Sequence, residues 1–213
     1  MSDVEPLPEP ESRRPVPWGP IGLVVALLFL AGAIGFVIGG RDADVPTSSV
    51  DEGFLLDMSE HHDQAVTMAL YELANGQDPT VRQFATEVLL SQRQELGQMA
   101  RMLAERRVSR PDYDADRPAM GWMGMATTVG TMPGMASPAD LDRLEQSEGR
   151  EADLLFLELM MAHHEGGIHM AEDAAANAED PAVRELAARI VKVQASEVAE
   201  YQMQLHRMQA SGA

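Results

Sequence analysis

Residues 58–103 read MSEHHDQAVTMALYELANGQDPTVRQFATEVLLSQRQELGQMARML, and residues 160–205 read MMAHHEGGIHMAEDAAANAEDPAVRELAARIVKVQASEVAEYQMQL. The two stretches align without a gap at an offset of 102 residues, and 15 of the 46 aligned positions are identical. Self-similarity of this kind indicates an internal structural repeat. Asp78-Pro79 and Asp180-Pro181 occupy matching positions, and an aspartate before a proline is typical of a helix N-terminus. Each half is therefore predicted to be a helical hairpin that turns just before its Asp-Pro pair.

The patterns around the repeat predict an all-α protein, since no convincing alternating strand pattern is present. Ser49-x-x-Glu52 forms a capping box that opens the first helix, and Ser137-Pro138 opens a short helix that ends by Gly149. The long helices are expected at residues 49–75, 79–107, 150–177 and 181–209. They predict an antiparallel four-helix bundle over residues 50–209, with residues 108–136 as a long crossover rich in methionine.

The N-terminal part of the chain contains an uncharged run of 23 residues, from Trp18 to Gly40. This run is long enough to cross a bilayer, and residues 18–40 are predicted to be a transmembrane anchor. Arg13 and Arg14 precede it, so the positive-inside rule keeps residues 1–17, a disordered tail rich in proline, in the cytoplasm. Residues 41–49 are then a linker to a bundle that lies in the periplasm or the extracellular space.

Two further interpretations of the apolar run remain open. The first is a cleaved signal sequence, because Ala31-Gly32-Ala33 offers small residues in the order that signal peptidase needs. The apolar run continues beyond that point, which favours an uncleaved anchor. The second is a homo-oligomer, because Gly35-x-x-x-Gly39 matches a helix-dimerisation pattern.

Composition and charge exclude several classes of function. Lys+Arg 16 against Asp+Glu 34 gives a net charge of -18, which argues against nucleic acid as a partner. The chain has no cysteine, so disulfides, thiolate metal sites and thiol catalysis are excluded. It has instead 15 methionines, and no triad or phosphate-binding glycine loop that would indicate an enzyme.

The repeat places methionine and histidine together on one flank of the first helix of each hairpin. Thioether and imidazole ligands without thiolate suit Cu(I), or Cu(II) through the histidines, better than magnesium, calcium or manganese. The sequence therefore predicts a copper-binding protein. The alternative is that the methionines fill gaps in the core and the histidines are hydrogen-bonded interior groups. The predicted metal ligands are His61, His62, His163, His164, Met58, Met68, Met160, Met161 and Met170.

Polar residues also interrupt the apolar stripe on the second helix of each hairpin. They are Glu95, Glu197, Gln92 and Gln194. These side chains are expected to accept hydrogen bonds from the histidine N–H groups and so to orient the rings. The alternative is that these four residues are half-exposed at the edge of the core and have no role at a metal site. The crossover methionines either capture Cu(I) or pack over one end of the bundle.

MSEHHDQAVTMA, ELMMAHHEGGIHMAEDA and the MPGM of the crossover resemble the bacterial domain-of-unknown-function family 305, whose copper-binding representatives are called CopM. The resemblance covers about residues 50–209. It implies a ferritin-like helical bundle, export to the periplasm or cell exterior, and, in CopM-like members, copper binding through methionine and histidine.

These observations together predict a membrane-anchored, exported protein that buffers copper or confers copper resistance without turnover. A scaffolding bundle of a membrane complex that holds no metal is the first alternative. A ferritin-like redox enzyme is the second. No histidine here follows a glutamate by three residues, which argues against the Glu-x-x-His pairs of di-iron enzymes.

Overall fold

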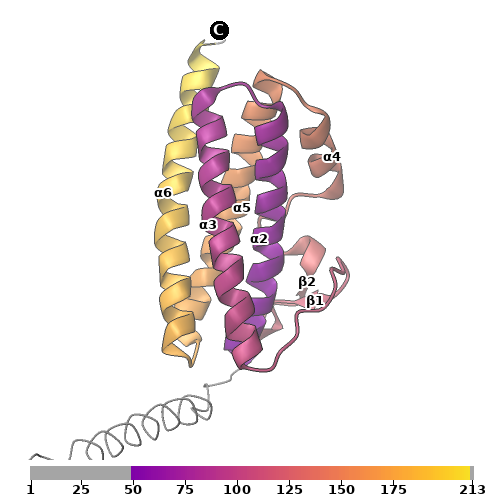
Figure 1. The fold of residues 1–213 in the computed structure, drawn as a ribbon, viewed down its shortest axis with the longest axis vertical. Helices are drawn as coiled ribbons and strands as arrows, with labels where there is room; N and C mark the ends of the chain where they lie inside the picture. Colours follow the sequence, from indigo (N-terminus) through magenta and orange to yellow (C-terminus); the bar gives the residue numbers. More distant parts are fainter. Residues whose placement is uncertain (1–48, 212–213) are drawn as a thin grey trace, which may run out of the picture. The chain divides into compact units, whose positions relative to one another are not determined.

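The computed structural model describes residues 49–211, and they form an almost entirely helical protein (Figure 1). The crossover adds a two-residue antiparallel ladder, β1 (Pro118–Ala119) with β2 (Thr127–Thr128), and the short 3-10 helices η1 (Gly121–Met123) and η2 (Val129–Thr131). The α-helices of this region are α2 (Ser49–Asn75), α3 (Pro79–Glu105), α4 (Pro138–Gln146), α5 (Arg150–Asn177) and α6 (Pro181–Ser211). The all-α prediction is confirmed for this part of the chain.

Each Asp-Pro pair begins the second helix of its hairpin, as the repeat predicts. The Asp78 carboxylate accepts hydrogen bonds from the backbone N–H groups of Thr80 and Val81, at 2.8 and 3.2 Å. The Asp180 carboxylate accepts one from Ala182 at 2.7 Å. These bonds satisfy N–H groups that lack a partner inside the helix, so each hairpin turns within a few residues.

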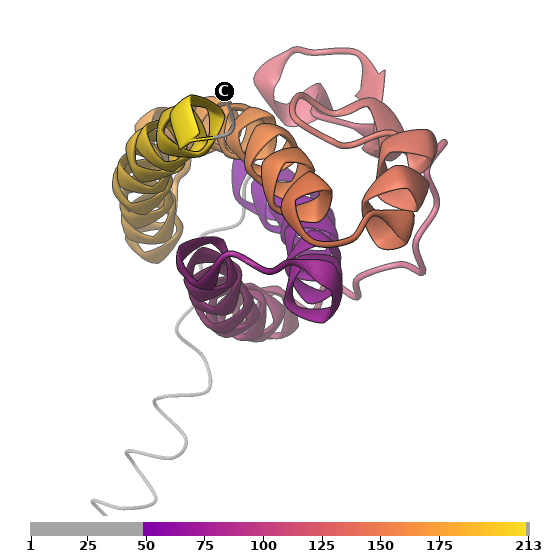
Figure 2. The ribbon, with the colours of Figure 1, turned by 90° about the horizontal axis from the view of Figure 1, so that it is seen from above.

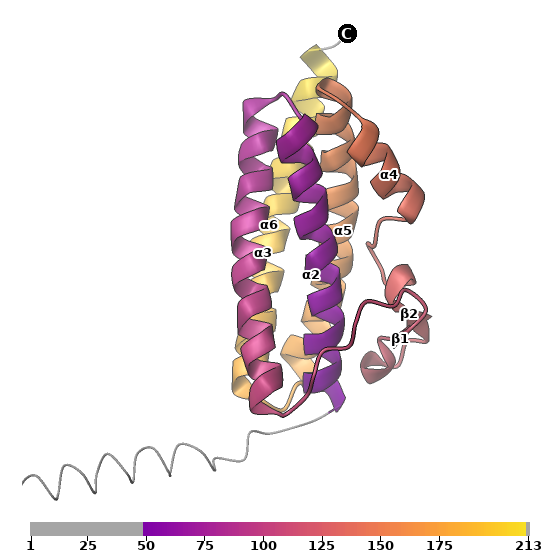
Figure 3. The ribbon, with the colours of Figure 1, turned by 45° about the vertical axis from the view of Figure 1, so that its right-hand side comes forward.

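The two hairpins pack together through their first helices. In the view from above, the helices follow one another in the order α6, α5, α2, α3 (Figure 2). The short α4 and the crossover lie against the outer flank of α2 and α5 (Figure 3). The crossover therefore covers a side of the bundle, so the second of the two alternatives for its methionines, packing over one end, is wrong.

The first helical turn of each hairpin binds the loop that connects the two helices of the other hairpin. Asp153 in α5 is fully buried and accepts hydrogen bonds from the backbone N–H groups of Gln77 and Asp78, at 2.9 and 3.0 Å. Asp51 in α2 likewise accepts one from the N–H of Asp180 at 3.2 Å. Asp51 and Asp153 are themselves 102 residues apart. This reciprocity is what two halves related by an approximate two-fold axis produce.

Buried apolar side chains form two clusters, and the methionines of the repeat are divided between them. Met58 and Met170 belong to one cluster, whereas Met68 and Met160 belong to the other. Every one of these four side chains is fully buried. Because α2 and α5 are antiparallel, the middle of both helices lies between the clusters, and that is where the paired histidines fall.

No helix within residues 49–211 is long and apolar enough to cross a membrane. The predicted anchor at residues 18–40, the tail at 1–17 and the linker before Ser49 lie outside the described residues. The membrane orientation of the chain therefore stays a prediction.

Glu72 makes the hairpin loop of the first half sensitive to pH. Its side chain is fully buried near Asp153, and burial, together with the influence of the neighbouring Asp153 carboxylate, raises the pKa of Glu72 to about 9. Asp78 raises this pKa further, whereas Arg82 opposes the shift. The folded protein therefore holds Glu72 in its protonated form at neutral pH.

Changing Glu72 to Gln is expected to remove a loss of stability that accumulates as the pH rises from about 4.5 to 9. Because the pKa of Glu72 is higher in the folded than in the unfolded protein, proton binding by Glu72 stabilises the fold. This stabilisation is complete below about pH 4.5 and is lost as the pH rises through 9. Between these values the parent should lose roughly 1 kcal/mol per pH unit relative to Glu72→Gln. Urea unfolding of both proteins from pH 5 to 9 measures the difference. Parallel stability curves would contradict the prediction.

Candidate metal centre

Four buried histidines occupy the layer between the two apolar clusters. His61 and His62 lie in α2, His163 and His164 lie in α5, and all four are 0% exposed. Adjacent residues on a helix point about 100° apart. As a result, one histidine of each pair faces the other hairpin and one faces the second helix of its own hairpin.

His61 and His163 meet across the contact between α2 and α5. Their rings are stacked, with centroids 3.7 Å apart and planes inclined by 35°. His61 Nε2 lies 3.2 Å from the carbonyl oxygen of Pro133 in the crossover. Since a carbonyl only accepts, Nε2 carries the proton and Nδ1 of His61 has a free lone pair.

His62 and His164 each lie beside a glutamate of the neighbouring helix. His62 Nε2 is 2.7 Å from Glu95 Oε2, and His164 Nε2 is 2.8 Å from Glu197 Oε2. A carboxylate favours the N–H on the nitrogen that faces it, which leaves the lone pair on Nδ1. The contact of His62 with Glu95 is a hydrogen bond, whereas His164 and Glu197 are within ion-pair distance only. That the glutamates orient the rings of metal ligands stays a prediction.

None of the four Nδ1 atoms has a hydrogen-bond partner within residues 49–211, although each is buried. An imidazole nitrogen removed from water without a partner destabilises the folded state. Burial, and secondarily the charge of His62, lowers the pKa of His61 to about 3. Burial and the charge of His61 lower the pKa of His163 well below its usual value. Both rings are therefore neutral, which is the state that binds metal ions.

The histidines do not converge on one point. Within the described residues, no three His, Asp or Glu side chains come close enough to hold a metal ion by themselves. The four rings divide instead into the His61–His163 pair and two separate His–Glu pairs. A metal bound by His61 and His163 would need further ligands of another kind.

Thioethers are the candidates for those ligands. Met58 and His61 are one helical turn apart, and Met160 and His163 repeat the arrangement. Met68 and Met170 lie beyond the histidines in the same helices, also fully buried. Met161 is half-buried and packs against the cluster that contains Met160. His169, His206 and Met203 are exposed and lie outside this layer.

Gln92 and Gln194 are each 2% exposed, so they are not half-exposed residues at the edge of the core. Gln92 Oε1 and both polar atoms of the Gln194 side chain lack hydrogen-bond partners among residues 49–211. A Cβ added at Gly167 would lie 2.5 Å from Gln194 Oε1 and 3.2 Å from His61 Cε1. Gln194 therefore lies beside the His61 ring, where Gly167 makes room for both.

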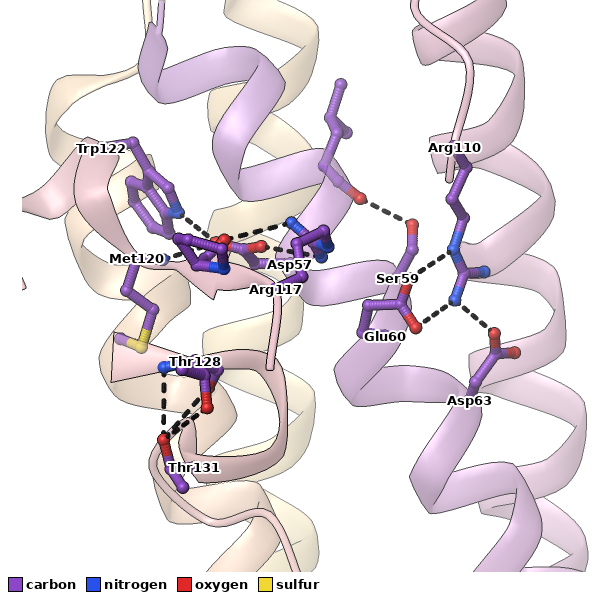
Figure 4. Close-up of polar contacts among 12 residues, drawn as sticks. Asp57, Ser59, Glu60, Asp63, Arg110, Arg117, Met120, Trp122, Thr128 and Thr131 are labelled. Atoms are coloured by element: carbon purple, nitrogen blue, oxygen red, sulfur yellow. Dashed lines mark hydrogen bonds and ion pairs between the residues drawn. The ribbon is translucent and has the colours of Figure 1, made fainter. Parts of the chain in front are cut away.

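Buried acidic residues of α2 bind the crossover, and sequence analysis missed them. The Asp57 carboxylate accepts hydrogen bonds from the Met120 backbone N–H at 2.7 Å and from the Trp122 indole N–H at 2.9 Å (Figure 4). Arg110 donates to Glu60 and Asp63 on the same helix (Figure 4). Asp57 and Glu60 are each only 3% exposed. Their spacing of three residues is the only sequence signal, and it also fits a solvated helix face.

Residues 132–136, here called the strap, cover the histidine pair. Gln64 accepts a hydrogen bond from the Ala136 N–H at 2.6 Å and donates one to the Ala136 carbonyl at 3.0 Å. Gly134 has a φ of +82°, and a Cβ there would lie 2.6 Å from the carbonyl oxygen of Ala162. A Cβ at Gly166 would come within 2.0 Å of the Pro133 oxygen. Glycines on both surfaces thus let the strap lie directly against α5.

Comparison with known proteins identifies close likenesses over the whole bundle. The family model described as "Domain of unknown function (DUF305)" matches residues 51–205. A DUF305 protein from Streptomyces coelicolor, named as a candidate secreted protein, is 34% identical, with a TM-score of 0.68 over 75% of this chain and 94% of that one. A DUF305 fragment from Deinococcus radiodurans is 30% identical, with a TM-score of 0.65 over 76% of this chain and 99% of that one.

CopM in its Cu(II)-bound form shares the fold, with 23% identity and a TM-score of 0.59 over 74% of this chain and 96% of that one. CopM structures in Cu(I)-bound and silver-bound forms match similarly. Among curated proteins, "Uncharacterized protein L153" of Acanthamoeba polyphaga mimivirus is 34% identical over 58 residues. That segment spans 27% of this chain and only 38% of the viral protein.

Proposed function

Because this chain belongs to the DUF305 family and shares its fold with copper-bound CopM, we propose that it binds copper as a buffering or resistance protein. The observation that carries the proposal is the buried His61–His163 pair, whose neutral rings each keep an unused nitrogen lone pair. Such a pair lowers the stability of the metal-free protein. A cation that accepts both lone pairs would offset that loss.

The kinds of ligand present favour copper over harder cations. We assign His61 and His163 as nitrogen ligands, with sulfur ligands drawn from the four fully buried methionines of α2 and α5. Thioether and imidazole together suit Cu(I). His62 and His164, each beside a carboxylate, offer a harder set of ligands that suits Cu(II).

The cellular location forms part of the proposal. Residues 18–40 would anchor the chain in the cell membrane, with the bundle in the periplasm or the extracellular space. The Streptomyces relative, named as a candidate secreted protein, supports export of the bundle. Metal buffering on that side of the membrane needs no catalytic group.

Metal competition tests the proposed function directly. The full chain is equilibrated with equal concentrations of copper, zinc and iron, freed of unbound metal, and analysed for metal content. We expect copper to be retained in preference to zinc and iron. Recovery of a folded but metal-free protein would favour the scaffolding alternative.

Replacing Met58 and Met160 by leucine should weaken Cu(I) binding without unfolding the protein. Leucine keeps the volume and apolarity of the side chain, so each change should lower the free energy of unfolding by less than about 1.5 kcal/mol. Leucine offers no lone pair, so we expect Cu(I) affinity to fall by about tenfold or more. Competition against a coloured Cu(I) chelator measures it.

The matched control for this experiment is Met125→Leu, because Met125 lies in the crossover and is 36% exposed. The control should bind Cu(I) as the parent does. If the double variant also binds like the parent, the methionines are packing residues and only the histidine part of the proposal survives.

A further inference from the structure

The histidine pair has no open path to solvent. His61 and His163 are 0% exposed, and the strap lies over them with the Pro133 carbonyl against His61 Nε2. If this pair binds copper, as proposed above, a segment of the chain must move to let the ion reach the buried rings.

A pocket of about 550 Å3 adjoins the strap, between α2, α4 and the start of the crossover. Met135 of the strap and Gln64, which binds the strap, both line it. Its carboxylates, from Glu60, Asp63 and Asp112, outnumber its one guanidinium, from Arg110. A pocket with an excess of negative charge raises the local concentration of cations.

The repeat itself is broken where the strap lies. Gln64 in α2 corresponds to Gly166 in α5, at the common offset of 102 residues. Gln64 forms two hydrogen bonds to Ala136, whereas Gly166 leaves the space that the Pro133 carbonyl occupies. One half of the site therefore holds the strap through Gln64, and the other half makes room for it through Gly166.

We infer that this pocket is the route by which copper reaches His61 and His163, and that the strap is a gate held shut by Gln64. Met135 is the first sulfur ligand that an incoming Cu(I) ion meets, because it is the methionine that lines the pocket and it belongs to the strap itself. Opening requires the Gln64–Ala136 hydrogen bonds and the Pro133–His61 hydrogen bond to break together. The inference depends on the proposed copper binding, but it concerns rates rather than affinity.

The test compares Gln64→Ala with the parent in stopped-flow transfer of Cu(I) from a coloured chelator to the full chain. Loss of two hydrogen bonds should make the gate open about ten times more often. Association and dissociation rates of Cu(I) should therefore both rise about tenfold, with the dissociation constant unchanged within about twofold. Hydrogen exchange at the Met135 and Ala136 amides, measured without metal, should accelerate in parallel.

Two matched controls accompany this experiment. Gln83→Ala removes a side chain that donates a hydrogen bond to Glu87 on the exposed face of α3, and it should change neither the copper rates nor the amide exchange. Met135→Leu should slow Cu(I) association severalfold at unchanged stability, whereas Met125→Leu should not.

Different results overturn different claims. Faster amide exchange with unchanged copper rates would overturn the inference and place the route elsewhere, for example beside Glu95 and Glu197, whose side chains are 17% and 15% exposed. Unchanged exchange would overturn the role of Gln64. Absence of equilibrium copper binding in the parent would instead refute the proposed function.

Discussion

His163→Leu should stabilise the metal-free protein and at the same time remove most of its copper affinity. Neither ring nitrogen of His163 makes a hydrogen bond within residues 49–211, and the ring is fully buried. Replacing such a group by an apolar side chain of similar size removes a desolvation penalty of about 1–3 kcal/mol. The same change deletes one of the two nitrogen ligands, so copper affinity should fall by about 100-fold or more.

The pseudo-symmetric variant His61→Leu provides the matched comparison. His61 Nε2 donates to the Pro133 carbonyl, so leucine there leaves that carbonyl without its donor. We expect the same loss of copper affinity as for His163→Leu. The gain in stability should be smaller than that of His163→Leu by about 1 kcal/mol. Exposed His206→Leu should change neither quantity. Urea unfolding of the metal-free proteins and chelator competition measure the two effects.

A decrease in stability for His163→Leu would contradict the first part of the prediction. It would mean that the buried ring contributes more through packing than it loses through its unpaired nitrogens. Unchanged copper affinity would remove His163 from the proposed ligand set, whatever the change in stability.

Asp153→Ala should be the most destabilising single change at the contact between α5 and the loop of the first hairpin. The buried carboxylate accepts the backbone N–H groups of both Gln77 and Asp78. Alanine leaves two donors without acceptors, and each costs about 1–3 kcal/mol. We expect the free energy of unfolding to fall by about 2–4 kcal/mol at pH 7.

Asp153→Asn keeps one acceptor oxygen and should lie between the alanine variant and the parent. Asp142 in α4 is exposed, so Asp142→Ala controls for the removal of a carboxylate and should have little effect. Chemical denaturation at neutral pH compares the variants. Equal stability of Asp153→Ala and Asp142→Ala would show that the reciprocal loop contacts do not hold the hairpins together.

Much of the helical architecture follows from local sequence. The start of α3 at Pro79 and of α6 at Pro181 agrees with the Asp-Pro signals, because capping depends on residues within one turn of each other. The 102-residue offset predicts two equivalent hairpins, since the same local preferences act twice. The burial of Met58 and Met160 follows from their place on the apolar flank of each helix.

Contacts between distant segments required the tertiary structure. Asp51 and Asp153 look like ordinary acidic residues of a first helical turn, and nothing nearby in sequence indicates that each binds the loop of the other hairpin. Asp57 and Glu60 look like a solvated face until the crossover covers them. The strap and its Gln64 contacts join residues 72 positions apart.

The sequence by itself therefore determined the repeat, the helices and the set of methionine and histidine residues that we propose as copper ligands. Only the tertiary structure decided that adjacent histidines separate, with His61 facing His163 and with His62 and His164 facing Glu95 and Glu197. The physical reason is that helix formation depends on neighbours within a turn or two. The partner of a buried polar side chain depends instead on which distant segment packs against it, and many packings satisfy the same local pattern.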